Sequence, residues 1–241
     1  MSEIDLTSLL NALPGLKNAA FTITQKDAIA HWVRKEVYRV SKETRPYLEM
    51  EFKYGSVDWK GRIFPGIRKE SFQNIKDELS KKSKVIDLRP VETKDIFTKK
   101  GRLTISPEKK LLHSLKKKKI AQAVLKCPGK KYSIKITIAA ELPNNLPKDF
   151  KWENEPTIDP ARHKKRFAFA VSDLKENSFK LENISIDLSE IECRKKETYE
   201  VELELGRTLL DEIFNEENSE ASQCEIITKF IEDGETLLAM L

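Results

Sequence analysis

Apolar and polar residues alternate with a period of two through the middle of the chain, a period typical of β-strands with one buried face. The alternation begins in "YLEMEFKYG" (47–55) and ends in "TYEVELELG" (198–206). Between these two segments it recurs in "GRLTIS", "KYSIKITIAAE", "HKKRFAF" and "ISIDLS". The pattern predicts a series of antiparallel strands between residues 46 and 206.

Apolar residues spaced three or four apart predict helices at both ends of the chain and one helix between the strands. The internal helix covers residues 68–83, with Phe72, Ile75 and Leu79 on one side. The proline-rich segment 142–161 predicts a loop. We therefore expect a single α+β domain over residues 1–241. Its expected parts are an N-terminal helical segment (1–45), the strands with their helix (46–206) and C-terminal helices (207–241).

The composition is that of a globular protein without a membrane anchor. Charged residues make up 34% of the 241 residues and apolar residues 39%. No apolar run approaches the about 20 residues that span a bilayer, and the N-terminus does not resemble a secretory signal. The three cysteines have no paired spacing, which argues against a disulfide framework or a zinc site and fits a reducing intracellular compartment. We expect all three histidines to be structural.

Charge is segregated among the predicted strands. Basic runs occur at 116–119, 129–131 and 162–166, within a net charge of +5. Such runs suit a polyanionic partner, although most are simply solvated surfaces. The run 116–119 would attract RNA or form a solvated helix end or turn. Acidic residues, by contrast, alternate on the first and last strands, where like charges side by side cost stability.

A closed barrel with its polar faces turned inward explains this segregation. For any single strand, a polar face turned to solvent remains the ordinary alternative. Inside a barrel, carboxylates would hold a hard divalent cation while Arg and Lys side chains bind an anion beside it. That combination suits a triphosphate, and the chain has no Walker-type glycine loop that would bind phosphate through backbone amides.

The order of the motifs resembles that of the triphosphate tunnel metalloenzymes. The acidic motifs "EMEFKYG" (49–55) and "EVELEL" (200–205) enclose "RLTI", "IAAELP" and "RHKKR" in the expected order. The resemblance is strongest to the metal-dependent RNA 5′-triphosphatases of mRNA capping in fungi, protists and some viruses, and it covers about residues 28–215. It implies an α+β fold, a closed antiparallel eight-stranded β-barrel (tunnel) with flanking α-helices.

The resemblance also implies roles for individual residues. Glu49, Glu51 and Glu204 would bind the metal, Mg²⁺ or Mn²⁺. Glu141 would orient or deprotonate the attacking water, and Glu202 would orient metal-bound water or basic side chains. The implied phosphate-binding residues are Arg102, Lys164, Arg166, Lys53 and Lys180. The implied remaining tunnel wall consists of Glu200, Lys135, Asp187 and Ser189.

One strand departs from the family pattern, which has a basic-x-acidic-x-Thr sequence before the final acidic motif. The segment "ISIDLSEI" supplies Asp187 and Ser189, but Ser185 stands where an arginine is expected. Lys180 would take the basic position only in a different register. Both assignments remain open from the sequence.

The implied reaction is hydrolysis of the β–γ bond at the 5′-triphosphate end of nascent RNA, the first step of cap formation in the nucleus. Nucleoside triphosphates would be substrates in the presence of Mn²⁺. A separate capping guanylyltransferase is implied as a partner, because the chain lacks the Lys-centred nucleotidyl motif.

Two other functions remain open. "EMEFK" also opens the tunnel-fold hydrolases of thiamine triphosphate, inorganic triphosphate or polyphosphate, although the three-glutamate closing motif favours the RNA branch. A basic β-domain that binds RNA without catalysis is the non-enzymatic alternative.

Overall fold

Eight antiparallel strands close into a barrel in the computed structural model, which describes residues 6–82, 90–147, 150–170 and 184–241. Neighbouring strands pair in the order β6–β5–β4–β8–β9–β10–β2–β7, and β7 pairs back onto β6. The strands are β2 (Leu48–Val57), β4 (Val91–Thr98), β5 (Gly101–Ile105), β6 (Leu111–Lys126), β7 (Ser133–Pro143), β8 (Thr157–Ala170), β9 (Ile184–Cys193) and β10 (Lys196–Leu205). The predicted eight-stranded barrel is confirmed.

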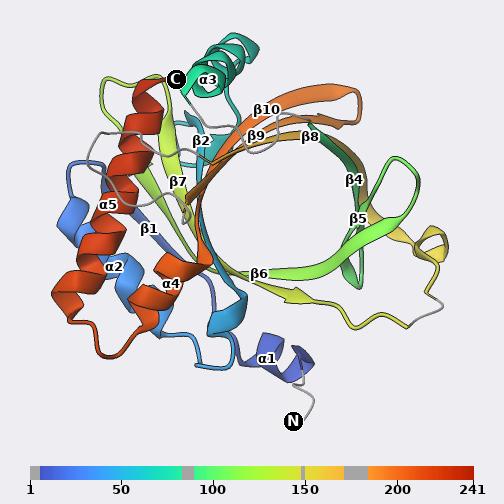
Figure 1. Ribbon diagram of the computed structural model, residues 1–241, viewed down its shortest axis with the longest axis horizontal. Helices are drawn as coiled ribbons and strands as arrows, with labels where there is room; N and C mark the ends of the chain where they lie inside the picture. Colours follow the sequence, from blue (N-terminus) through green and yellow to red (C-terminus); the bar gives the residue numbers. More distant parts are fainter. Residues whose placement is uncertain (1–5, 83–89, 148–149, 171–183) are drawn as a thin grey trace.

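Helices and two further strands surround the barrel (Figure 1). The helices are α1 (Leu6–Ala12), α2 (Lys26–Tyr38), α3 (Lys69–Lys82), α4 (Arg207–Phe214) and α5 (Glu220–Ala239), with 3-10 turns η1 (Arg45–Tyr47) and η2 (Trp152–Asn154). The helix predicted over 68–83 is therefore present as α3. No helix in these described ranges is long and apolar enough to cross a membrane.

The N-terminal segment is not wholly helical, and the expectation for residues 1–45 is wrong at this point. Strand β1 (Lys17–Thr22) lies between α1 and α2 and pairs in parallel with β6. A second short strand, β3 (Ile63–Pro65), extends β2 as a hairpin. The six residues of β1 are too few to show a clear period, and their partner lies about 100 residues further along the chain.

The outward face of β2 is buried under α5. Met50, Phe52 and Tyr54 are at most 1% exposed, and the Phe52 ring lies 4.2 Å from that of Phe230 on α5. The Tyr54 hydroxyl donates to the carbonyl of Gly234 (3.0 Å). A Cβ atom at Gly234 would lie 2.5 Å from the Phe52 ring, so only glycine allows this approach. The odd-numbered residues of β2 must therefore face the barrel interior.

The two sides of the barrel are covered differently. Helices α2, α4 and α5 lie beside β2, β7 and β10, whereas in the described part of the chain the β4–β5 wall has beside it the short 3-10 turn η2 and no α-helix (Figure 1). There the apolar residues Ile96, Leu103 and Ile105 are covered by the segment after β7, including Phe150 and Trp152. The predicted loop 142–161 thus serves as a cover for this wall, although β7 and β8 take up its ends.

Candidate active site

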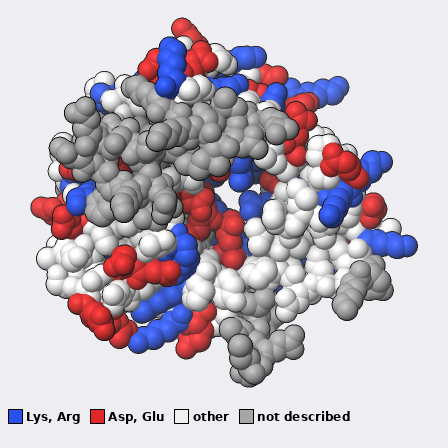
Figure 2. Space-filling model, in the orientation of Figure 1, with Lys and Arg blue, Asp and Glu red and all other residues white. Residues whose placement is uncertain are grey.

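The polar faces of the strands line a cavity of about 710 Å³ inside the barrel. Figure 2, in the orientation of Figure 1, shows an opening with acidic side chains along one side and basic side chains along the other. Its lining includes Glu51, Lys53, Arg102, Lys135 and Glu200. Residues from the first and the last barrel strands thus face one interior space.

Strand register brings the two acidic motifs together. Strands β2 and β10 pair so that Glu51 lies opposite Glu204 and Lys53 lies opposite Glu202. On its other edge, β10 pairs with β9, which places Asp187 opposite Glu202. Alternate residues of a strand share a face, so these side chains form one continuous acidic surface inside the barrel.

We call Glu49, Glu51 and Glu204 the carboxylate cluster, because Glu51 lies close enough to both of the others to raise the pKa of each. The ammonium of Lys117 bridges it, at 2.8 Å from Glu49 and 3.5 Å from Glu51. The same ammonium lies 3.2 Å from Glu141 on β7. A cation is thus already held by several carboxylates at this place.

Sequence reasoning missed Lys117. The run 116–119 is neither a helix end nor a turn but part of strand β6, in which Lys117 lies opposite Glu141. The neighbouring Lys118 points the other way and donates to the carbonyl of Leu10 (2.8 Å). Extending the period of two from "HSL" through the lysines would have indicated that alternate lysines face inward.

The carboxylate cluster carries more negative charge than its surroundings neutralise. Burial, together with the nearby Glu51 and Glu141, raises the pKa of Glu49 to about 9, against the opposing effect of Lys117. Burial and the carboxylates of Asp187, Glu51 and Glu141 raise the pKa of Glu204 to about 7. An added cation would relieve both effects. Hard oxygen donors with excess negative charge fit a divalent ion such as Mg²⁺ or Mn²⁺.

Lys53 forms the centre of a second arrangement, the Lys53 network (Lys53, Glu202, Lys164, Arg166 and Asp187). Its ammonium lies 2.5 Å from Glu202 and 3.7 Å from Glu200. Burial would lower the pKa of Lys53, but Glu202, Glu51 and Glu200 outweigh it and raise that pKa. Burial would likewise raise the pKa of Glu202, but Lys53 and Lys164 outweigh it and lower that pKa. Both groups therefore stay charged.

Basic side chains of β8 and β5 pair with carboxylates of the tunnel wall. Arg166 lies 3.4 Å from Asp187, and Arg102 lies 3.3 Å from Glu141. Burial lowers the pKa of Lys164, against the effect of Glu202. Arg162, which sequence reasoning also missed, lines the cavity, with its guanidinium 5.0 Å from the centre of the Phe97 ring. Arg162 lies on the same face of β8 as Lys164 and Arg166 because the three are two residues apart. This spacing could have indicated its position from the sequence.

Two buried polar atoms in the tunnel wall lack a hydrogen-bond partner within the described residues. They are the Oγ of Ser189, a residue with 0% exposure, and the Nε of Arg102. Buried polar groups are normally satisfied, so each atom would gain a partner if a small shift of the wall brought it to a ligand oxygen in the tunnel. An anion with several oxygen atoms fits such a wall.

Two assignments left open by the sequence have different outcomes. In the observed register Ser185 lies opposite Glu204, on the same face as Asp187 and Ser189. In this register a serine occupies the position of the motif at which the family has a basic residue. Lys180 lies outside the described residues.

Lys135 lies opposite Lys53 and lines the cavity, as expected for the tunnel wall. Burial, together with Lys119 and Lys53, lowers the pKa of Lys135.

Comparisons with known proteins agree with the barrel fold. Two solved structures of the RNA triphosphatase Pct1 of S. pombe, one in complex with the Spt5 CTD, match with a TM-score of 0.67. Sequence identity is 18% for the complex and 19% for the other structure; 88% of this chain is covered in both, with 92% and 91% of Pct1. At this identity the likeness shows the fold. A search of curated proteins found no match.

A family profile gives the membership. The profile described as "mRNA capping enzyme, beta chain" matches residues 69–241. This range is well over half of the chain and contains the barrel strands from β4 to β10. The chain therefore belongs to the mRNA triphosphatase family, the beta chain of mRNA capping enzymes.

Proposed function

We propose that the tunnel hydrolyses the β–γ phosphoanhydride bond at the 5′-triphosphate end of RNA, leaving a diphosphate end and inorganic phosphate. The observation that carries this proposal is the pairing of β2 with β10. It places Glu51 beside Glu204 and Lys53 beside Glu202 within one cavity. A surplus of carboxylates beside buried cations suits a metal-bound polyphosphate.

The family is metal-dependent in general, and we assign the metal to the carboxylate cluster. Glu49, Glu51 and Glu204 would hold Mg²⁺ or Mn²⁺, and Lys117 would shift towards Glu141 or the phosphates. The bound ion would neutralise charge on the phosphate oxygens and make the γ-phosphorus more open to attack.

The basic wall would hold the phosphate chain in line for attack. Arg102, Lys164 and Arg166 would donate to its oxygens, joined by the unsatisfied hydroxyl of Ser189. Lys53 is held by Glu202 at 2.5 Å, so its ammonium would be pre-positioned rather than free to rotate. Pre-organised donors of this kind stabilise charge that develops in the transition state.

Glu141 would orient the attacking water or accept its proton. Burial would raise the pKa of Glu141, but Lys117 and Arg102 outweigh it and lower that pKa. The carboxylate is thus ionised at neutral pH and able to accept a hydrogen bond or a proton. It lies between Lys117 and Arg102, which ties its position to both the metal side and the phosphate side.

The cellular setting is part of the proposal. A capping triphosphatase acts on nascent RNA, so we place the chain in the nucleus. A separate guanylyltransferase would complete the cap. The S. pombe Pct1 structure in complex with the Spt5 CTD is a precedent for association with another protein. Free nucleoside triphosphates would be a secondary substrate with Mn²⁺.

The test is release of γ-phosphate from triphosphate-ended RNA with Mg²⁺ or Mn²⁺. Glu51→Gln and Glu204→Gln should reduce release at least about 100-fold. The matched control is Glu190→Gln on β9, a carboxylate on the opposite face of its strand from Ser189, which should retain activity.

Parallel assays with thiamine triphosphate, inorganic triphosphate and polyphosphate test the other branch of the family. Faster phosphate release from any of them than from RNA would overturn the RNA assignment. RNA binding with no phosphate release from any substrate would support the non-enzymatic alternative.

A further inference from the structure

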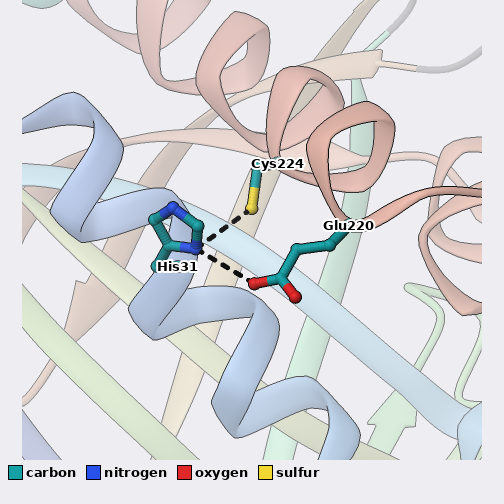
Figure 3. Close-up of side chains that lie close together, drawn as sticks. All are labelled: His31, Glu220 and Cys224. Atoms are coloured by element: carbon teal, nitrogen blue, oxygen red, sulfur yellow. Dashed lines mark hydrogen bonds and ion pairs between the residues drawn. The ribbon is translucent and has the colours of Figure 1, made fainter.

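Three potential metal ligands lie together on the helices outside the barrel. His31 of α2 faces Glu220 and Cys224 of α5 (Figure 3). The His31 Nδ1 atom lies 3.3 Å from Glu220 Oε1 and 3.6 Å from Cys224 Sγ. All three ligand atoms lie within 4.8 Å of one another. None of these residues belongs to the tunnel.

The two helices bring this group together across nearly the whole chain. Glu220 and Cys224 are four residues apart at the start of α5, so they lie on one face of that helix. Helix α2 runs antiparallel to α5, since Lys26 pairs with Glu235 (3.0 Å) while Arg34 pairs with Glu220 (3.2 Å). This arrangement places His31 opposite the first turns of α5.

The distances match those of a tetrahedral zinc site. Zinc binds nitrogen and oxygen at about 2.0–2.1 Å and sulfur at about 2.3 Å. At a tetrahedral angle these bonds separate nitrogen and oxygen by about 3.3 Å, and nitrogen and sulfur by about 3.6 Å. The His31–Glu220 and His31–Cys224 separations are 3.3 Å and 3.6 Å. These two separations are thus those of a tetrahedral site, and the Glu220 and Cys224 ligand atoms lie within 4.8 Å of each other.

Hydrogen bonding satisfies the group only in part, because an Nδ1–H of His31 that donates to Glu220 leaves the Cys224 sulfur as at most a weak, shared acceptor. One imidazole nitrogen carries either a proton or a lone pair. If Nδ1 of His31 donates to Glu220, it cannot accept from the Cys224 thiol. If it accepts from the thiol, it faces the Glu220 carboxylate without a hydrogen. A metal ion takes a lone pair from all three groups at once.

A second set of contacts fixes the Glu220 carboxylate. Its other oxygen, Oε2, pairs with Arg34 at 3.2 Å. The Nε of Arg34 in turn donates to Gln223 at 2.7 Å, and Gln223 is only 2% exposed. These contacts leave Oε1 directed at His31, in the way that outer contacts orient the ligands of known metal sites.

We propose that His31, Glu220 and Cys224 bind a Zn²⁺ ion, which would link α2 to α5. The fourth position would be taken by water or by Asp27, one turn before His31 on α2. A thiolate and an imidazole favour zinc over Mg²⁺ or Mn²⁺, so this site differs in chemistry from the tunnel. This proposal revises two expectations from the sequence, that the chain has no zinc site and that its histidines are structural. Cysteine spacing could not indicate the site, because its ligands are one cysteine, one histidine and one glutamate spread over two distant helices.

The test is a titration of the metal-free full chain with Zn²⁺, and with Co²⁺ as a spectroscopic probe of thiolate ligation. It is done in excess Mg²⁺ and repeated in the Glu51→Gln variant, so that the tunnel does not contribute. We expect one equivalent of Zn²⁺ to bind and a thiolate-to-cobalt absorption band to appear. Cys224→Ser and His31→Gln should each lower zinc affinity at least about 10-fold and abolish the band or shift it. Cys193→Ser, on β9, is the matched control and should keep both.

Thermal unfolding distinguishes site loss from misfolding. Without zinc, Cys224→Ser and His31→Gln should unfold within a few degrees of the unsubstituted chain, since His31 is exposed and serine is close in size to the half-buried Cys224. With saturating zinc only the unsubstituted chain and Cys193→Ser should gain stability. Equal zinc affinity in the unsubstituted chain and His31→Gln would overturn the proposal, as would a cobalt spectrum without a thiolate band. Neither readout depends on phosphohydrolase activity.

Discussion

Glu202 and Glu204 are two residues apart on one strand and share one face, yet their surroundings make them different acids. Glu204 lies opposite Glu51, and its pKa is raised to about 7. Glu202 lies opposite Lys53, and its pKa is lowered. The carboxylate cluster therefore carries unbalanced negative charge, whereas each carboxylate of the Lys53 network has a cationic partner, Lys53 for Glu202 and Arg166 for Asp187. Two residues along β10 thus separate a place that needs an added cation from one that does not.

This difference separates a group of residues that binds a ligand, the carboxylate cluster, from a group that keeps its geometry without one, the Lys53 network. Unbalanced carboxylates cost stability in the metal-free protein and are retained where they bind something. Balanced charges keep their geometry without a ligand. Glu51 lies where the two arrangements meet, at 3.6 Å from Lys53 and 3.5 Å from Lys117. Metal and phosphate sites would therefore share one carboxylate.

Removing the cation of the Lys53 network should have the largest effect on stability. Lys53→Met leaves Glu202 buried without its nearest partner, which should lower the free energy of unfolding by about 3–5 kcal/mol. Chemical denaturation at pH 7 measures this. Lys165→Met, on the outward face of β8, should change stability by less than about 0.5 kcal/mol. The double variant Lys53→Met/Glu202→Gln should recover part of the loss. No recovery would mean that Lys53 acts by packing and not by charge.

Loss of one carboxylate from the cluster should mainly affect activity. Glu204→Gln should lower kcat at least about 100-fold and shift the metal concentration needed for half-maximal rate upward. Stability without metal should not fall, because an unbalanced charge is removed. Glu200→Gln on the same strand tests the contrast: it should change the rate with little change in metal requirement. An equal shift in metal requirement for both variants would extend the cluster to Glu200.

Divalent metal should stabilise the fold through the cluster alone. At a metal concentration about 100 times Kd, binding adds about 2.7 kcal/mol to the free energy of unfolding. This increase in stability should be present in Glu200→Gln and absent in Glu204→Gln. The shift in Tm on adding Mg²⁺ or Mn²⁺ measures it. A full shift in Glu204→Gln would place the ion elsewhere.

The faces of the strands could be predicted from the sequence because a period of two needs no knowledge of the partners. Met50, Phe52 and Tyr54 are buried under α5 as their alternation requires, and the glutamates of β2 and β10 face the same cavity. The role of Lys117 could not be read in this way, since its contact with Glu49 depends on the register of β6 against β7 and of β7 against β2. Contacts between distant segments, such as β1 with β6, leave no local signal.

The smallest expected effect is on how the free energy of unfolding of the metal-free protein depends on pH. It is also the effect that most directly distinguishes the carboxylate cluster from the Lys53 network. The folded chain holds a proton on Glu49 up to a pKa of about 9, whereas the unfolded chain loses it near the usual 4.5. Between these pH values the folded state binds more protons than the unfolded state, so stability falls as pH rises. Glu49→Gln removes this penalty. With metal chelated, it should raise the free energy of unfolding at pH 8 by about 1 kcal/mol or more and leave it nearly unchanged at pH 5. Denaturant titrations at both pH values measure this.

Glu202→Gln should behave in the opposite way and lose stability at pH 8, because it removes a carboxylate whose pKa is lowered by its partners. If both substitutions destabilise the protein at pH 8, the carboxylate cluster is as well balanced as the Lys53 network, and its need for a cation would have to be argued from catalysis alone.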